Sequence, residues 1–360
     1  MVRGSLDADA RERYDHGTHW ISAAVERGLP FGVDNRLVTA VVVFNLVPDL
    51  LAAVYVLTQW GEWSVQFLAA AALFTAWANL APYLIWYYDQ RVLPSFFHTV
   101  AEIVVETDRL DELAVRYNEY YEGFRPLFAL LWGGGFLAAG YFGAGVFEAQ
   151  GMTGDGRIFL WTTLAYGAYV GGVLGEAGFS GTVTTLLLVR EVAGLEFDIQ
   201  PLHPDGLGGL STVGEFAIRT TLLWSSASLL IPLSFQLIAG TGSLNVVMAG
   251  VTAGYVATIL ATFLYPTLLI NRRSEEIRSR RLESLRREYL ALQEQVDRGD
   301  AEGMDDVNRR LEMQQLRSQY DDYATVRLYP LQVGIFVRLA GSVLLPLFFL
   351  LLEYYLPTIA

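Results

Sequence analysis

The stretch RLVTAVVVFNLVPDLLAAVYVLTQW, residues 36–60, is the part of the sequence that decides the fold. After Arg36 it carries a single charged residue, Asp49, in an otherwise apolar run. A run of about 20 apolar residues has the length that an α-helix needs to cross the hydrocarbon core of a bilayer. Comparable runs recur along the chain and predict seven transmembrane helices, at residues 36–60, 63–88, 126–147, 158–180, 216–239, 244–270 and 339–357.

The composition of the whole chain supports the same class of protein. Of the 360 residues, 53% are hydrophobic, 13% are aromatic and only 18% are charged. This balance predicts an all-α polytopic protein of the cell membrane, with the lipid bilayer as its first partner, because only helices and closed barrels satisfy every backbone polar group inside lipid. The chain has no cysteine, which excludes disulfides, thiolate metal sites and cysteine nucleophiles.

The charged residues are unusual in kind. All 25 basic residues are arginines, and the 38 carboxylates bring the net charge to −13. An acidic surface without lysine is typical of proteins from very high salt, where charge repulsion is screened, so the composition predicts a haloarchaeal source. The absence of lysine excludes a retinal Schiff base. The excess of acid argues against a nucleic-acid partner.

The placement of the arginines predicts the orientation in the membrane. With the N-terminus in the cytoplasm and the C-terminus outside, every arginine except Arg157 falls on the cytoplasmic side. The chain then divides into an N-terminal cytoplasmic segment, a body of six spans, a cytoplasmic helical hairpin and a divided seventh helix. These parts are residues 1–35, 36–270 (with an amphipathic helix at 89–125 and a loop at 191–215), 271–325, and 326–360 (an apolar part at 326–338 before the membrane part at 339–357).

Polar residues inside the predicted spans are the first candidate sites. Asp49 lies near the middle of the first span, next to Pro48 and one helical turn after Asn45. Because a carboxylate in a bilayer is costly, we expect a ligand or ion site here, with Asn79 of the second span as the partner of Asp49. Glu176, nearer the cytoplasmic end of the fourth span, is a further candidate. A neutral Asp49 that only bonds a neighbouring helix is the structural alternative.

Small residues at a spacing of four run along the third and fourth spans. They include Gly135 and Gly143 on one span and Gly167, Gly171 and Gly175 on the other. Such faces let helix backbones approach closely, so we expect these two spans to pack against each other.

The loop FDIQPLHPDGLGGL, residues 197–210, is the most motif-like polar stretch. His203 and Asp205 could ligate a metal or respond to pH, whereas the surrounding prolines and glycines favour a structural turn. One histidine and one aspartate do not make a metal site, so we expect no metal and no cofactor. The residue combinations that an enzyme would need are missing. The serine of GFSG (178–181), for example, has no histidine in any predicted span to act as its base.

The last predicted span suggests a pore. Ser342, Pro346, Phe349 and Glu353 recur at spacings of four, three and four, which places them on one face of a helix. In an oligomer with this helix at its centre, the face would form a hydrophobic constriction below a ring of carboxylates, a pattern typical of cation pores. A bundle-core or lipid-facing helix is the alternative interpretation.

The whole arrangement resembles the insect odorant and gustatory receptors. The shared features are seven spans, an internal N-terminus, helical extensions into the cytoplasm, a divided seventh helix and a chain that ends just outside. The resemblance covers most of the chain but lies in topology, because the tyrosine- and glutamine-phenylalanine signature of that family is missing: Gln332 is followed by Val333. It implies a tetrameric ligand-gated cation channel with residues 326–338 in a central anchor and 339–357 in the pore.

Three functions follow from these patterns. The first is a homo-oligomeric, ligand-gated cation channel opened by a small molecule that enters among the first six spans from outside. The second is a non-conducting membrane receptor or scaffold that signals through the hairpin at 271–325. The third is an ion-coupled transporter that uses Asp49.

Overall fold

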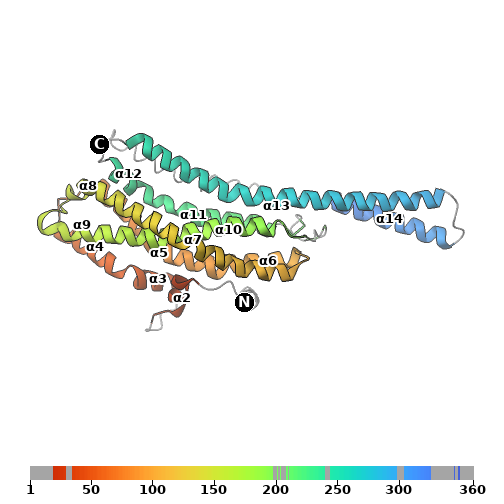
Figure 1. The fold of residues 1–360 in the computed structure, drawn as a ribbon, viewed down its shortest axis with the longest axis horizontal. Coiled ribbons are helices and arrows are strands. Elements are labelled where there is room, and N and C mark those ends of the chain that lie inside the picture. Colours follow the sequence, from red (N-terminus) through yellow and green to blue (C-terminus); the bar gives the residue numbers. More distant parts are fainter. Residues whose placement is uncertain are drawn as a thin grey trace.

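The computed structural model describes residues 19–29, 35–197, 201, 203, 208–209, 211–239, 244–297, 304–325, 344 and 348. These residues form a long bundle of helices, drawn in Figure 1. No β-strand occurs among them, and an isolated antiparallel bridge joins Val104 to Phe197. The all-helical class predicted from the sequence is confirmed for this part of the chain.

The helices follow one another with few breaks, and several α-helices pass directly into π-helical or 3-10 turns. The N-terminal half contains α2 (Trp20–Arg27), α3 (Arg36–Phe44), α4 (Leu46–Thr58), α5 (Val65–Tyr87), the π-helix η1 (Tyr88–Val92), α6 (Leu93–Ile103), α7 (Thr107–Phe142) and α8 (Ala144–Glu148). The remainder contains η2 (Gly154–Gly156), α9 (Arg157–Tyr169), the π-helix η3 (Val170–Gly175), α10 (Glu176–Val192), α11 (Ser211–Ser225), the 3-10 helix η4 (Ser226–Leu230), α12 (Ile231–Ala239), α13 (Leu244–Asp297) and α14 (Met304–Thr325).

Four helical stretches of the described chain are long and apolar enough to cross a membrane. They are Val65–Ile103, Gly154–Val192, Glu215–Leu237 and Ala253–Asp297, and α3 with α4 makes a fifth if the bent pair is one span. The stretch predicted as the third span, 126–147, falls on α7 and α8 and is not among them. Of the predicted seventh span, 339–357, only positions 344 and 348 are described, so Ser342, Pro346, Phe349 and Glu353 lie outside the described residues.

The first predicted span is bent by 69° at Asn45, between α3 and α4. Pro48 explains the bend, because proline has no N–H to donate to the carbonyl of Phe44 and its ring crowds that carbonyl. The same chemistry recurs in α5, where Pro82 leaves the carbonyl of Ala78 without its helical donor. The Asn45 side chain fills this gap: its Nδ2 donates to the Ala78 oxygen at 2.9 Å. The buried amide of Asn45, at the bend beside Pro48, therefore satisfies the carbonyl that Pro82 leaves without a donor.

The prediction of one amphipathic helix at 89–125 is wrong. Residues 88–103 continue α5 through η1 into α6, and a second helix, α7, begins at Thr107 and runs to Phe142. The break falls at Val104, a β-branched residue in extended backbone that pairs with Phe197, and Asp108 then favours a new helix N-terminus. Helical periodicity on both sides of a three-residue break hid this corner from the sequence pattern.

The close approach between α7 and η3 occurs at glycines, as the ladders suggested, but mostly at different ones. A Cβ on Gly133 would lie 3.0 Å from the Gly172 Cα, and a Cβ on Gly171 would lie 2.6 Å from the Trp132 carbonyl oxygen. Cβ atoms on Gly135 and Gly167 would meet no other atom within 4 Å among the described residues. Only Gly171 of the expected ladder therefore carries the contact between these two helices.

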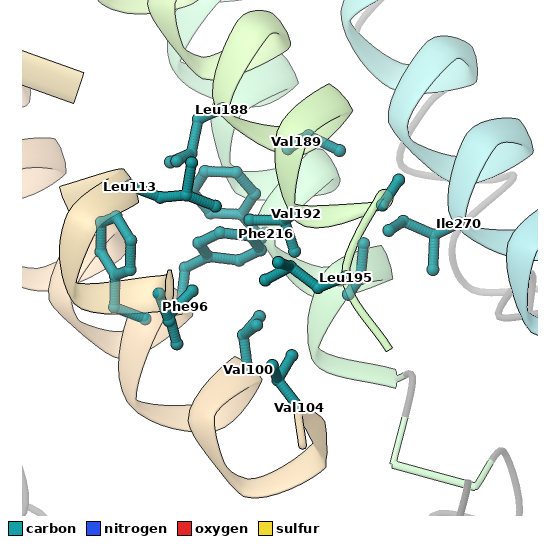
Figure 2. Packing of buried hydrophobic residues seen from close by; sticks show 14 of the residues in the cluster. Phe96, Val100, Val104, Leu113, Leu188, Val189, Val192, Leu195, Phe216 and Ile270 are labelled. Carbon is teal, nitrogen blue, oxygen red and sulfur yellow. The ribbon is translucent and has the colours of Figure 1, made fainter. Parts of the chain in front are cut away.

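The largest hydrophobic cluster, called here the packed cluster, joins α6, α7, α10, α11 and α13. Figure 2 shows its side chains converging from these helices, with Phe96 and Phe216 at the centre. The two rings stack with centroids 4.1 Å apart, and Phe96 is 1% exposed and Phe216 3% exposed. The other buried members are Val92, Leu93, Phe97, Val100, Ile103, Val104, Leu110, Leu113, Ala114, Tyr117, Leu188, Val189, Val192, Ala193, Leu195, Phe197, Val213 and Ile270.

The helices α13 and α14 pack against each other and extend well beyond the rest of the bundle (Figure 1). At 1.5 Å per residue the 54 residues of α13 reach about 80 Å. Leu285 of α13 is fully buried, but Leu311 of α14 is 58% exposed. The apolar residues of α14 therefore do not all pack against α13.

Candidate functional site

A cavity of about 560 Å³, called here the bundle cavity, lies among the helices of the bundle. Its walls come from α5, α7, α10, α11, α12 and α13 and from the turns between them, and they are mostly apolar. The volume falls in the range of roughly 300–1,000 Å³ that is typical of small-molecule sites, and the space between helices of a bundle is a common place for one. This cavity is the best-formed candidate site in the described part of the chain.

Three departures from α-helical geometry border the cavity. Asp89 comes from the π-helix η1, Gly175 from the π-helix η3, and Ser226 from the 3-10 helix η4. A π-turn adds a residue to the helix and re-aims the side chains around it, and such turns are frequent at functional sites. The cavity therefore forms where three helices stop following the regular α repeat.

Aromatic side chains from four helices form one wall of the cavity. The ring of Phe179 on α10 lies between Trp132 of α7 and Trp224 of α11, with both centroid distances at 5.4 Å. Tyr255 of α13 continues the row, 6.0 Å from Trp224. The Tyr255 hydroxyl donates to the carbonyl oxygen of Trp224 at 2.7 Å, which fixes α13 against the end of α11. Such rows present flat, rigid apolar surface to a bound molecule.

The tryptophans of the cavity differ in their hydrogen bonding. Nε1 of Trp77 donates to the Ser226 hydroxyl at 3.1 Å. Nε1 of Trp132 and Nε1 of Trp224 are buried, and neither finds an acceptor among the described residues. Leaving a buried donor without a partner costs about 1–3 kcal/mol, so each such group asks for an explanation. Neighbouring atoms shield both N–H groups, so neither opens onto the cavity.

The end of the cavity that is lined by His19, Asp89 and Glu122 is polar. His19 caps the N-terminus of α2: its side-chain Nδ1 accepts from the Ile21 N–H at 3.3 Å, and its backbone N–H donates to Asp89 Oδ2 at 3.2 Å. The imidazole ring packs edge-on against Tyr121 with centroids 5.4 Å apart. Ile21 of α2, the helix that packs against α5, is completely buried.

Burial at this end controls protonation. It lowers the pKa of His19 to about 4, with the nearby Arg125 guanidinium as the second cause. Burial also raises the pKa of Tyr121, and the charge of Glu176 adds to this. At neutral pH the imidazole and the phenol are therefore both uncharged. The polar end offers hydrogen-bonding groups rather than additional charge.

The intramembrane residues expected from the sequence form a separate cluster. Asn79 Nδ2 donates to Asp49 Oδ1 at 3.1 Å, so Asp49 has the partner that its position suggested. Asn45, completely buried, accepts from the Tyr166 hydroxyl at 3.0 Å while it donates to Ala78. None of these three predicted site residues, Asn45, Asp49 and Asn79, is among the residues that line the cavity. Their contacts hold α3, α4, α5 and α9 together.

Glu176 lies beside the cavity, away from the Asp49 cluster. It is 3% exposed and accepts from the Ser180 hydroxyl at 2.8 Å, one turn along α10. Both of its chain neighbours, Gly175 and Ala177, line the cavity. Arg125 is the basic group that faces it across the helix pair.

Of the remaining predicted residues, the structure describes only His203. His203 lies in the loop between α10 and α11, near Gly209, and Asp205 lies outside the described residues. Within the described ranges, no group of three or more His, Asp or Glu side chains is placed to hold a metal ion. The pore residues of 339–357 likewise lie outside them.

The sequence pattern missed the aromatic residues of the cavity. Trp132, Phe179, Trp224 and Tyr255 sit on four different helices, and an aromatic residue inside an apolar run reads as ordinary core. One signal was present: glycines and serines weaken a helix, and they concentrate at Gly171–Gly172 and at Ser225–Ser228, where η3 and η4 form.

Comparison with known proteins adds no relative. No family model matches the chain, and neither a curated protein nor a solved structure is significantly similar to it. The functional argument therefore rests on the residues and the geometry of the chain itself.

Proposed function

We propose that the chain is a small-molecule receptor of the cell membrane, in which ligand binding in the bundle cavity gates a cation pore lined by residues 339–357 of a homo-tetramer. The observation that carries the proposal is the cavity itself, about 560 Å³ of mostly apolar space with an aromatic wall. Small-molecule sites are lined mostly by apolar and aromatic side chains, as this cavity is.

The topology that fits this function has seven spans, with the N-terminus in the cytoplasm and the C-terminus outside. The arginine distribution supports this orientation. With it, the cavity residues Leu84 and Ile85 of α5 and Thr182 of α10 belong to the cytoplasmic ends of their spans. Ser234 and Tyr255, which also line the cavity, belong to the outer halves of their spans, so the proposal keeps entry of the ligand from outside.

The helix α13 connects the cavity with the part of the chain that would form the pore. Tyr255 and Thr258 line the cavity, and α13 continues from them without interruption to Asp297. Pro266 lies between the cavity and the projecting half of the helix, at a point where a helix bends most easily. A ligand that displaces the Tyr255 segment would therefore move the α13–α14 hairpin, which leads directly to residues 326–357.

Recording in planar bilayers tests the proposal. The purified protein, reconstituted in concentrated KCl, should carry a cation current that changes on addition of naphthalene, the simplest flat apolar probe of the cavity. Gly181→Leu, which fills the cavity, should remove the response while keeping the basal current. Glu353→Gln should lower the conductance, most strongly in dilute salt, and Phe349→Ala should raise basal opening. A protein that conducts without any of these effects would contradict the assignment.

The second candidate is a non-conducting receptor that signals through the α13–α14 hairpin. The observation that favours it is a set of exposed apolar side chains on the hairpin, Leu290 at 48%, Val307 at 49% and Leu311 at 58%. Such groups are suited to contact a partner helix. Binding of naphthalene to a protein that carries no current in bilayers would select this candidate over the channel.

A further inference from the structure

We infer that the ligand of the bundle cavity is an organic cation, an ammonium group on a flat apolar ring system, with its charge held at the end of the cavity that Asp89 and Glu122 line. The inference rests on the proposed function, because it names the class of ligand that the same cavity binds. The kinds of polar group on the cavity wall carry it.

The charged side chains on the described wall of the cavity have one sign. They are Asp89 of η1 and Glu122 of α7, and no arginine is among the described residues that line the cavity. His19, at the same end, adds no opposing charge at neutral pH, because burial lowers its pKa to about 4. Apolar walls screen these carboxylates less than water does, so the space beside them favours a cation and disfavours an anion.

The surroundings of Tyr121 show the same balance of charge. Burial raises the pKa of this phenol, and the negative charge of Glu176 raises it further. Asp89 and Glu122 act in the same direction, whereas Arg125 opposes them. Arg125 pairs with Glu122 at 3.6 Å, but the two side chains are 38% and 66% exposed. Because an ion pair this exposed contributes little, exchanging the arginine for a ligand ammonium costs little as well.

Hydroxyl groups on the wall offer acceptors rather than donors. Five of them donate their proton to a backbone carbonyl, at distances between 2.6 and 2.9 Å: those of Thr182, Ser226, Ser234, Thr258 and Tyr255. A hydroxyl has one proton, so these oxygens can only accept a hydrogen bond from a ligand. Ser226, Ser234 and Thr258 are half-buried and not shielded as the indole N–H groups are. The wall therefore favours a ligand that donates hydrogen bonds, as an ammonium does.

The aromatic residues of the polar end also suit an organic cation. Tyr88 precedes Asp89 in the chain, and Tyr117 and Tyr121 line the cavity from the same helix as Glu122. The faces of aromatic rings attract ammonium groups. A metal ion fits less well, because no group of three or more His, Asp or Glu side chains is placed to hold one within the described ranges. The apolar remainder of the cavity accommodates the ring system.

The test compares three probes that share one ring system and differ in charge: 2-(aminomethyl)naphthalene, 2-(hydroxymethyl)naphthalene and 2-naphthoate. Their affinities for the purified full-length protein are measured by titration calorimetry in concentrated KCl, which screens attraction to the acidic surface of the chain. The wild type should bind the protonated amine about tenfold more tightly than the alcohol, since hydrogen bonds between charged groups are the stronger ones. The carboxylate should bind more weakly than the alcohol.

Amide variants test which groups hold the charge. Asp89→Asn and Glu122→Gln remove the negative charges and keep side chains of the same shape with an acceptor oxygen. Each should reduce the preference for the amine, and the double variant should bind amine and alcohol alike. Unchanged affinity for the alcohol shows that the cavity is intact in each variant. Glu119→Gln is the matched control, because Glu119 is an exposed residue of α7 that is not among the lining residues, and this variant should keep the preference.

Other outcomes overturn the inference in distinguishable ways. Gly181→Leu fills the cavity, since a Cβ at Gly181 meets nothing within 4 Å among the described residues, and Gly135→Leu on α7, equally open but on an exposed surface, is its control. A preference for the amine that survives in the double variant would mean that these carboxylates do not hold the charge.

Two further results separate the ligand class from the site. If the amine binds the wild type no more tightly than the alcohol, but Gly181→Leu blocks both, the ligand class is wrong and the cavity remains the site. If Gly181→Leu blocks no probe, or if no probe binds the wild type, the cavity is not the ligand site and the proposed function fails as well.

Discussion

Phe216 and Phe179 are aromatic residues on α11 and α10, two helices that touch one another, yet their surroundings are opposite. Phe216 is 3% exposed and stacks on Phe96 at 4.1 Å inside the packed cluster (Figure 2). Phe179 stands between two tryptophans at the edge of about 560 Å³ of space. Protein interiors are normally packed as densely as organic crystals. The side chains around Phe216 pack closely, whereas those around Phe179 leave a cavity between the helices.

The difference between the two regions follows from the backbone around them. Most members of the packed cluster lie on regular turns of α6, α7, α10 and α11. The cavity is bordered by the turns η1, η3 and η4, which displace the side chains from that register. The loosely packed region thus coincides with departures from α-helical geometry, and most of the densely packed region coincides with regular helix.

The largest expected effect is a difference in stability between two matched variants, one in each region. Phe216→Ala should lower the free energy of unfolding by about 3–5 kcal/mol, because it opens a hole in a closed cluster. Phe179→Ala should cost roughly half as much, since its ring already borders open space and loses fewer contacts. Thermal unfolding of the purified variants, followed by tryptophan fluorescence, measures both. Equal costs would show that the cavity is as tightly packed in solution as the cluster.

The next effect concerns the polar end of the cavity. The folded pKa of His19 is about 4 and its ordinary value is 6.5, so the unfolded state binds the proton more readily. The stability that neutral His19 contributes is complete above pH 6.5 and is lost as the pH falls toward 4. The groups that face the ring are Arg125 and Tyr121 of α7 and Asp89 of η1.

Between pH 7 and pH 5 this should lower the free energy of unfolding by about 2 kcal/mol. His19→Asn keeps an acceptor for the N-terminus of α2 but does not titrate, so it should remove that part of the pH dependence. Unfolding measured at both pH values checks this. An unchanged pH dependence in His19→Asn would mean that the imidazole is solvated and that the cavity is open at this end.

A third variant should stabilise the protein. Gly181→Leu replaces a poor helix former in a regular helix and adds apolar contacts inside the cavity, which should raise the free energy of unfolding by about 1 kcal/mol. Gly135→Leu on α7 gains the same helix propensity without the contacts. If Gly181→Leu is less stable than Gly135→Leu, the space beside Gly181 is already occupied by protein.

The smallest effect is expected at the surface of the packed cluster. Arg116 of α7 pairs with Glu191 of α10 at 2.8 Å, and the arginine side chain is 48% exposed. Exposed ion pairs contribute little, and less in the high salt that the composition suggests, so Arg116→Gln should change the unfolding temperature by no more than the experimental error. A clear loss of stability in concentrated KCl would show that the cluster depends on this charge pair as well as on its rings.

Some contacts between the helices could be predicted from individual residues of the sequence. Asp49 and Asn79 were expected to meet, because two polar residues in adjacent apolar helices are driven to pair, and they form a 3.1 Å hydrogen bond. The cavity could not be predicted. Trp132, Phe179 and Trp224 look like core residues in any apolar run, and whether their rings close on each other or surround a space depends on helix positions that hydrophobicity does not specify.

The sequence by itself determined that the described chain is all-helical with several helices long and apolar enough to cross a membrane, because long apolar runs with few charges satisfy their backbone polar groups within each helix. Only the tertiary structure decided the bend at Asn45, the corner at Val104 and the π-turns at Tyr88 and Val170. Each is a local departure from a helix that costs little along the chain and is stabilised by contacts with distant segments, such as Asn45 with Ala78 and Val104 with Phe197. A contact between residues far apart in the sequence leaves no periodic signal, and the site of this protein is made of such contacts.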